Sequence, residues 1–102
     1  MEVQVQIIRF VEEHQPAIVE AQFLDSSERC HKFIAKSAIF TTDWGLHAAS
    51  DYPQPGAIGC EALARWRDSE GRELVRITTA RPDDVESTEG LSEFVVLNTQ
   101  LS

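Results

Sequence analysis

Few side chains in this sequence combine the residue type and the spacing that metal binding requires. The candidate nitrogen and sulfur ligands lack any C-x-x-C or H-x-x-x-H spacing: His14, Cys30, His31, His47 and Cys60. Cys30 and His31 are neighbours, and neighbouring side chains of a strand point to opposite faces, so these two could not bind one ion. We therefore expect no metal site and no cofactor.

Nucleophilic catalysis has equally little support. The serines cluster in segments that read as turns: Ser26, Ser27, Ser69 and Ser87. Turn and capping chemistry already explains hydroxyl groups at such positions. Cys60 with His31 or His47 is the one pairing of nucleophile and base worth testing, and their separation in the sequence neither supports nor excludes it. We expect a non-enzymatic protein and keep an enzyme with a dispersed site around Cys60 as an alternative.

Acidic residues dominate the charge of the chain. Seventeen Asp and Glu against nine Lys and Arg give the 102 residues a formal net charge of -8, which opposes binding to nucleic acid or to an anionic membrane. Segment 80–93 holds five of these acids close together: Asp83, Asp84, Glu86, Glu89 and Glu93. The segment lacks the D-x-D-x-D-G spacing of a calcium loop, so it is either a contact surface for a basic partner or an ordinary solvated loop.

Arginine is concentrated in a different segment, residues 57–81. There a tryptophan has arginines on both sides: Arg65, Trp66, Arg67, Arg72 and Arg76. Such a group could form a stacking platform for single-stranded nucleic acid. Acidic residues are interleaved with it and would neutralise most of its charge: Glu61, Asp68, Glu70 and Glu73. An RNA- or nucleotide-binding function is therefore the second hypothesis.

The elements that must position these residues are strands. Val3, Val5 and Ile7 alternate with polar residues, which is typical of a half-buried strand. The apolar parity changes after Ile7, as a β-bulge or a strand that serves two faces of a closed sheet requires. Residues 17–41 predict a hairpin whose second arm is kinked, and residues 94–97 predict a final strand.

A second hairpin is predicted over residues 57–67 and 72–79. Gly71 fits the left-handed position of a three-residue loop with a G1 bulge. That loop would place Asp68 opposite Arg72 and Arg67 opposite Glu73, and the opposed charges favour this register.

The segment 42–56 has no strand periodicity and contains two prolines and two glycines. A short helical turn is predicted near residues 43–49, capped by Thr42 or Asp43. Trp44 lies in this segment, and a rigid aromatic side chain in a loop has the character of a contact residue.

The six strands together predict an all-β fold, a small closed or nearly closed antiparallel β-barrel in a single domain, 1–102. The chain has neither the order of a secretion signal at its start nor a run long enough to span a membrane, so the cytoplasm is the expected compartment. Cys30 and Cys60 are then expected to be reduced.

The first functional hypothesis is an acidic protein-interaction module that binds a basic protein. Its expected contacts are Trp44, Asp83, Asp84, Glu86 and Glu89. An immunity or antitoxin protein that masks a basic toxin is one concrete form of this hypothesis, because opposite charge speeds association. The sequence leaves the oligomeric state and the biological process open.

Overall fold

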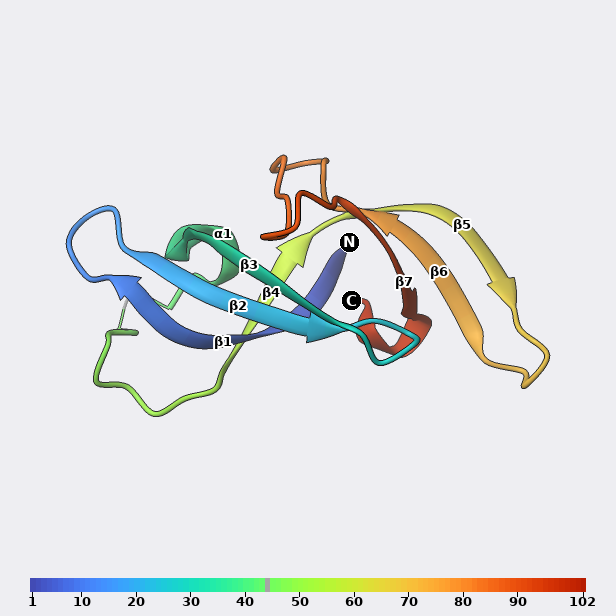
Figure 1. Ribbon diagram of the computed structural model, residues 1–102, viewed down its shortest axis with the longest axis horizontal. Helices are drawn as coiled ribbons and strands as arrows, with labels where there is room; N and C mark the ends of the chain where they lie inside the picture. Colours follow the sequence, from blue (N-terminus) through green and yellow to red (C-terminus); the bar gives the residue numbers. More distant parts are fainter. Residues whose placement is uncertain (44) are drawn as a thin grey trace.

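The computed structural model describes residues 1–43 and 45–102, which fold almost entirely into β-structure. In chain order the elements are β1 (Glu2–Glu12), β2 (Ile18–Leu24), β3 (Cys30–Lys36), α1 (Ser37–Phe40), β4 (Gln54–Gly59), β5 (Glu61–Arg67), β6 (Glu73–Thr78), β7 (Glu93–Leu97) and the 3-10 turn η1 (Asn98–Gln100). The strands make two antiparallel sheets, ordered β3-β2-β1-β4 and β5-β6-β7 (Figure 1). The all-β prediction is confirmed, with seven strands among the described residues instead of about six.

Backbone contacts at the middle of the molecule join the two sheets. Cys60 alone separates β4 from β5, so the chain passes directly from the first sheet into the second. The two termini meet there as well, because Glu2 and Ser102 exchange two backbone hydrogen bonds of 2.9 Å (Figure 1). A third contact comes from the turn between β2 and β3, where the backbone N–H of Ser26 donates to the carbonyl of Val95 in β7. The hydrogen-bonded ladders of the described strands form two sheets and not one ring, so barrel closure stays a prediction.

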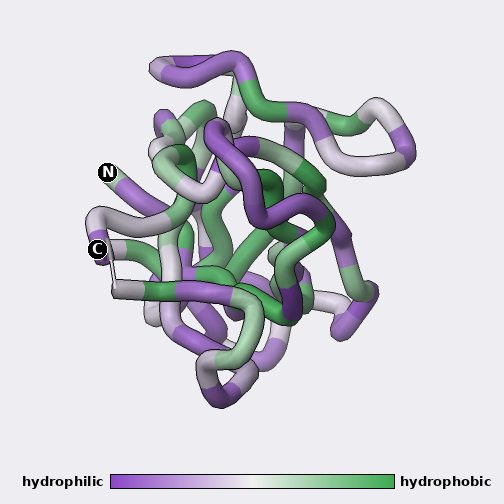
Figure 2. The backbone as a smooth tube through the Cα atoms, turned by 90° about the vertical axis from the view of Figure 1, so that its left-hand side faces the viewer, coloured by the Kyte–Doolittle hydropathy of each residue, from purple (hydrophilic) through white to green (hydrophobic). Residues whose placement is uncertain are grey.

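The core lies between the sheets and continues along the inner face of β1. Alternate residues of β1 are buried, as the period-two pattern predicts. Three aromatic rings from both sheets pack with centroids 5.3 to 5.8 Å apart: Phe23, Phe33 and Phe94. Figure 2 shows the hydrophobic segments inside and the hydrophilic segments in the outer loops.

The bulge predicted in the first strand is present. Pairing between β1 and β2 shifts between Ile7 and Arg9 and again between Phe10 and Glu12. The second arm of the first hairpin was predicted to continue to residue 41, but β3 ends at Lys36. The helix α1 follows at once and takes the place of the predicted kink.

The helical turn predicted near residues 43–49 is wrong, because the described part of that segment forms turns and the helix comes earlier in the chain. Tertiary packing decides the position of α1: Phe40 is buried, and its carbonyl oxygen lies 2.9 Å from where a Cβ would stand on Gly56.

The second hairpin has the predicted register at its turn. Asp68 and Arg72 are joined by a 3.1 Å backbone hydrogen bond, Gly71 has φ +80°, and Arg67 lies opposite Glu73. The predicted strand 57–67, however, is two strands in two sheets, β4 and β5. We call residues 61–78 the arm, because β5 and β6 project from the rest of the molecule (Figure 1). A bulge between Ala62 and Ala64 leaves Leu63 without a partner in β6, and its side chain is exposed.

Candidate functional site

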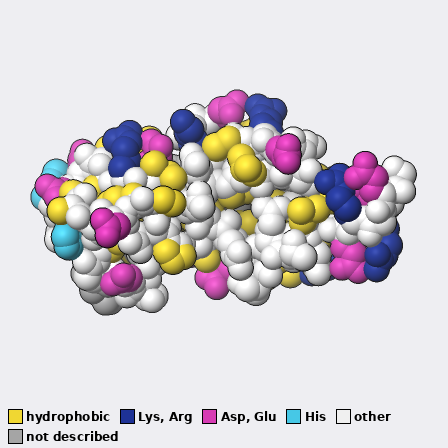
Figure 3. Space-filling view, turned by 90° about the horizontal axis from the view of Figure 1, so that it is seen from below, with side chains coloured by type: hydrophobic (Ala, Val, Ile, Leu, Met, Phe, Trp, Pro, Cys, Tyr) yellow, Lys and Arg dark blue, Asp and Glu magenta, His cyan; other side chains and the backbone are white. Residues whose placement is uncertain are grey.

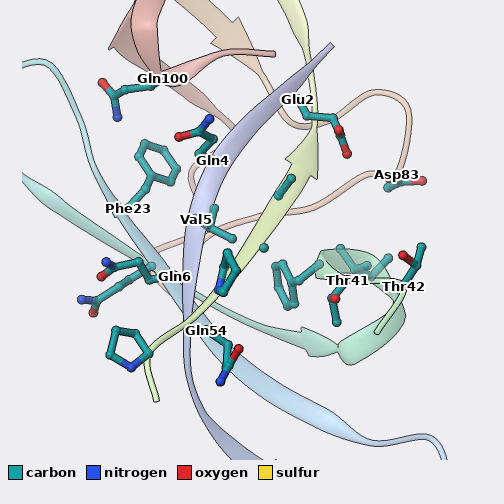
Figure 4. Close-up of a pocket in the computed structure, with 18 of the residues that line it drawn as sticks. Glu2, Gln4, Val5, Gln6, Phe23, Thr41, Thr42, Gln54, Asp83 and Gln100 are labelled. Carbon is teal, nitrogen blue, oxygen red and sulfur yellow. The ribbon is translucent and has the colours of Figure 1, made fainter. Parts of the chain in front are cut away.

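An open groove of about 1330 Å³ follows β4 and the first half of β1. We call it the β4 groove. Most of its lining comes from the start of β1, from β4 with Pro53, and from residues 38–42 of α1 and the segment after it. The rest comes from residues 22–24 of β2, from Pro82 and Asp83, and from Gln100 (Figure 4). The groove thus brings together six segments that are separated in the sequence.

The position of β4 follows from its small residues. Gly56 lies opposite Val5, and a Cβ at this glycine would stand 2.9 Å from the Phe40 carbonyl oxygen and 3.1 Å from Ile7 Cδ1. A Cβ on Gly59 would stand 3.0 Å from Pro82 Cδ. Glycine therefore allows α1 and the segment after β6 to approach β4 closely.

Both charged side chains that line the β4 groove among the described residues are acidic, Glu2 and Asp83. Glu2 lies opposite Gly59 in the ladder, and Asp83 Oδ2 lies 3.2 Å from a Cβ built on Gly59. The two carboxylates therefore belong to the same end of the groove (Figure 4). Most of the remaining polar lining is uncharged: Gln4, Gln6, Gln22, Thr41, Thr42, Gln54 and Gln100.

The acidic segment 80–93 is an anchored loop. Val85 and Ser87 are buried, and Thr79 Oγ1 donates to the carbonyl of Val85 over 2.6 Å. The carboxylates between these anchors point outward, since Asp83, Asp84 and Glu86 are all exposed.

The predicted contact residues are therefore not one surface. Asp83 lies in the β4 groove, whereas Glu89 accepts a hydrogen bond of 3.1 Å from Arg29. Asp84 and Glu86 lie between them in the loop, and Trp44 falls outside the described residues.

Each arginine of the arm lies within 4.0 Å of an acidic or amide side chain. Arg67 contacts Glu73 at 2.8 Å and Arg72 contacts Asp68 at 2.8 Å. Hydrogen bonds from the backbone and side chain of Arg72 lower the pKa of Asp68. The other two arginines interact more weakly with their partners. Arg76 lies 4.0 Å from Glu93, and Arg65 donates to the uncharged Asn98 Oδ1 over 2.9 Å.

Trp66 is 41 % exposed beside these pairs. Figure 3 shows basic and acidic side chains next to each other at the end of the arm. The interleaving that the sequence suggested is thus present in space, and the arm does not present an uncompensated basic face among its described residues.

Cys60 is 2 % exposed and belongs to the hydrophobic core. Burial raises the pKa of its thiol, and the charged groups that act on it are the N-terminus and Glu2, not a histidine. Only the thiolate is a strong nucleophile, so this environment gives no support to an enzyme built around Cys60. His47 lies in an exposed loop, where its backbone N–H donates to Ser50 Oγ.

A buried polar pair that the sequence analysis missed lies in the turn between β2 and β3. His31 is 4 % exposed, its ring lies between Phe23 and Phe94, and its Nε2 donates to Asp25 Oδ2 over 2.8 Å. Burial raises the pKa of Asp25. Hydrogen bonds from His31 and from the backbone N–H groups of Arg29 and Ser27 together lower this pKa by more than burial raises it, so the net shift is downward.

The signal for this pair was present in the sequence. Asp25 begins a turn of Asx type, and His31 shares the inward parity of Phe33. The pair fixes the turn whose Ser26 N–H bonds to β7, so we assign it a structural role.

Comparisons with protein-family models, with curated proteins and with solved structures found no match for this chain. The described residues contain no helix that is long and apolar enough to cross a membrane. They also contain no group of three or more His, Cys, Asp or Glu side chains placed to hold a metal ion. The case for a function therefore rests on the geometry and charge of the β4 groove.

Proposed function

We propose that this protein is an interaction module that binds a basic, extended segment of a partner protein in the β4 groove. The observation that carries the proposal is the lining of the groove, in which both charged side chains of the described residues, Glu2 and Asp83, are carboxylates. Lysine or arginine of a partner would be attracted to these carboxylates, and no described side chain in the lining is basic. Met1, which carries the charged N-terminal amino group, also lines the groove.

The distribution of ion pairs supports the same choice. Carboxylates of the arm are matched with arginines, so their charges largely cancel. The carboxylates that form no ion pair among the described residues all lie outside the arm: Glu2, Glu13, Glu28, Asp43, Asp51, Asp83, Asp84 and Glu86. The field that would steer a basic partner therefore originates from the part of the molecule that holds the groove.

The proposal refines the list of contact residues. Asp83 has the central position, because it belongs to both the acidic loop and the groove, while Asp84 and Glu86 extend the acidic surface. Glu89 contributes less, since its charge is compensated by Arg29. Masking of a basic toxin by an immunity or antitoxin protein is one form that such an interaction could take.

A short fluorescent peptide of alternating lysine and valine tests the proposal by fluorescence anisotropy. The double variant Glu2→Gln with Asp83→Asn should bind it about tenfold more weakly, equivalent to about 1.4 kcal/mol. The matched control is Glu13→Gln with Glu28→Gln, which removes two exposed, unpaired carboxylates outside the groove.

The control should bind like the wild type, and a peptide of alternating glutamate and valine should not bind. Equal weakening in both double variants would contradict the proposal, because net charge alone would then explain the binding.

A further inference from the structure

We infer that the basic segment binds by strand addition, pairing its backbone with the outer edge of β4. This inference rests on the proposed function and specifies the binding mode in the same groove. It follows from three observations: the direction of the backbone groups of β4, the state of the other sheet edges, and the position of the two carboxylates.

The pairing of β4 with β1 fixes which backbone groups point outward. The N–H of Cys60 donates to the Met1 carbonyl over 2.9 Å, so this residue directs its backbone groups toward β1. Groups alternate along an antiparallel strand, and the β1–β4 register is regular. The backbone groups of Pro55, Ala57 and Gly59 therefore point away from β1.

These outward groups are available for pairing. β4 is the last strand of its sheet, and no backbone hydrogen bond from outside the sheet reaches Ala57 or Gly59 among the described residues. Pro55 fits this arrangement, because an outward position is where a strand tolerates a residue without an N–H. An added strand could use the carbonyls of all three residues and the N–H groups of Ala57 and Gly59.

The other strand edges are less suitable for a basic segment. β3 already accepts a loop hydrogen bond at Lys32, from Thr88, and β7 accepts one at Val95, from Ser26. β5 carries a bulge, a common device against edge pairing, and it presents Arg65, whose partner Asn98 is uncharged, so this arginine would repel a basic strand.

Charge favours β4 for the same segment. Glu2 and Asp83 flank Gly59, the last residue of the free edge (Figure 4). A strand added there would place lysine or arginine beside both carboxylates while its backbone pairs with Ala57 and Gly59. Recognition would thus combine main-chain hydrogen bonds with charge at one end.

Amide hydrogen exchange of the full chain, with and without the lysine-valine peptide, tests this binding mode. The exchange of the Ala57 and Gly59 amides should slow about tenfold or more in the complex, because they gain hydrogen bonds. The amides of Ile58 and Cys60 already face β1 and should change little.

A substitution provides a second readout. Ala57→Pro removes an outward N–H without removing a bond to β1, and it should weaken peptide binding about tenfold. Ala57→Val keeps the N–H and is the matched comparison, and Ala57→Pro should bind the peptide about tenfold more weakly than Ala57→Val does. If Ala57→Pro does not fold, the exchange measurement on the wild type decides the question alone.

The two ideas fail in different ways. Strand addition is wrong if the peptide leaves the exchange of the Ala57 and Gly59 amides unchanged in the wild type. The groove proposal would survive that result if the double variant of Glu2 and Asp83 still loses binding. The proposed function itself fails if those charge variants bind the peptide like the wild type.

Discussion

The β4 groove and the arm are both polar and exposed, yet their charges are arranged in opposite ways. In the arm each described arginine lies within 4.0 Å of an acidic or amide side chain, as in the 2.8 Å pairs of Arg67 with Glu73 and Arg72 with Asp68. In the groove Glu2 and Asp83 have no basic partner among the described residues. A region rich in charge can therefore be neutral as a surface, whereas two unpaired carboxylates in a groove can define a binding site.

The comparison extends to the backbone. The groove is built on glycines that permit close approach, while the glycine of the arm serves only its turn. A Cβ on Gly56 would stand 2.9 Å from a backbone oxygen, and a Cβ on Gly71 would meet no atom of the described residues within 4 Å. The two regions therefore respond differently to the same substitution.

Gly56→Ala should produce the largest effect. The new methyl group would force α1 away from β4, at a cost of up to about 3 kcal/mol in the free energy of unfolding. Gly71→Ala should cost about 1 kcal/mol, because only its φ of +80° is unfavourable for alanine. Urea unfolding of both variants measures the difference, and equal losses would contradict the close approach of α1.

Asp25→Asn should come next, since Asp25 fixes the turn that joins the groove sheet to the arm sheet. The carboxylate accepts hydrogen bonds from His31, Ser27 and Arg29. A neutral amide would weaken these bonds, which should lower the free energy of unfolding by about 2 kcal/mol at neutral pH.

The pH dependence of this loss has a defined sign. The pKa of Asp25 is lowered by folding, so its contribution is present above the unfolded pKa of about 3.9 and disappears as the pH falls through the lower folded pKa. Unfolding curves of the wild type and Asp25→Asn should therefore converge below about pH 4. A constant difference down to the lowest pH would contradict the assigned role.

The ion pairs of the arm should contribute least. Arg67 and Glu73 are 65 % and 52 % exposed, so a double-mutant cycle with alanine should give a coupling energy of about 0.2 to 1 kcal/mol that salt reduces. A larger, salt-insensitive coupling would mean that the arm is held together by its charges and not by Val75 and Ile77 in the core.

Local patterns were sufficient to predict the parts of the fold that depend on neighbouring residues. The turn at Asp68 to Gly71, the opposition of Arg67 and Glu73 and the bulge after Ile7 all follow from local spacing. The break at Cys60 does not, because residues 57–67 have continuous strand character and the change of sheet coincides with the packing of Pro82 against Gly59.

The same distinction applies to the candidate site. Asp83 was predicted as a contact from the density of acidic residues, whereas Glu2 looked like the polar side of an ordinary strand. Its role depends on the pairing of β1 with β4 and on the position of Asp83 over Gly59, which are contacts distant in the sequence. Four-residue helices such as α1 likewise leave too short a pattern to predict, and packing against Gly56 determines where this one forms.

Chemical-shift mapping of the full chain with the lysine-valine peptide tests most directly whether the groove, and not the arm, is the binding surface. The account predicts that the largest shift changes in a nitrogen-proton correlation spectrum occur at Glu2, Ala57, Gly59 and Asp83. The amides of Trp66 and Arg72 should stay in place. Changes centred on the arm, with the groove amides unmoved, would contradict it.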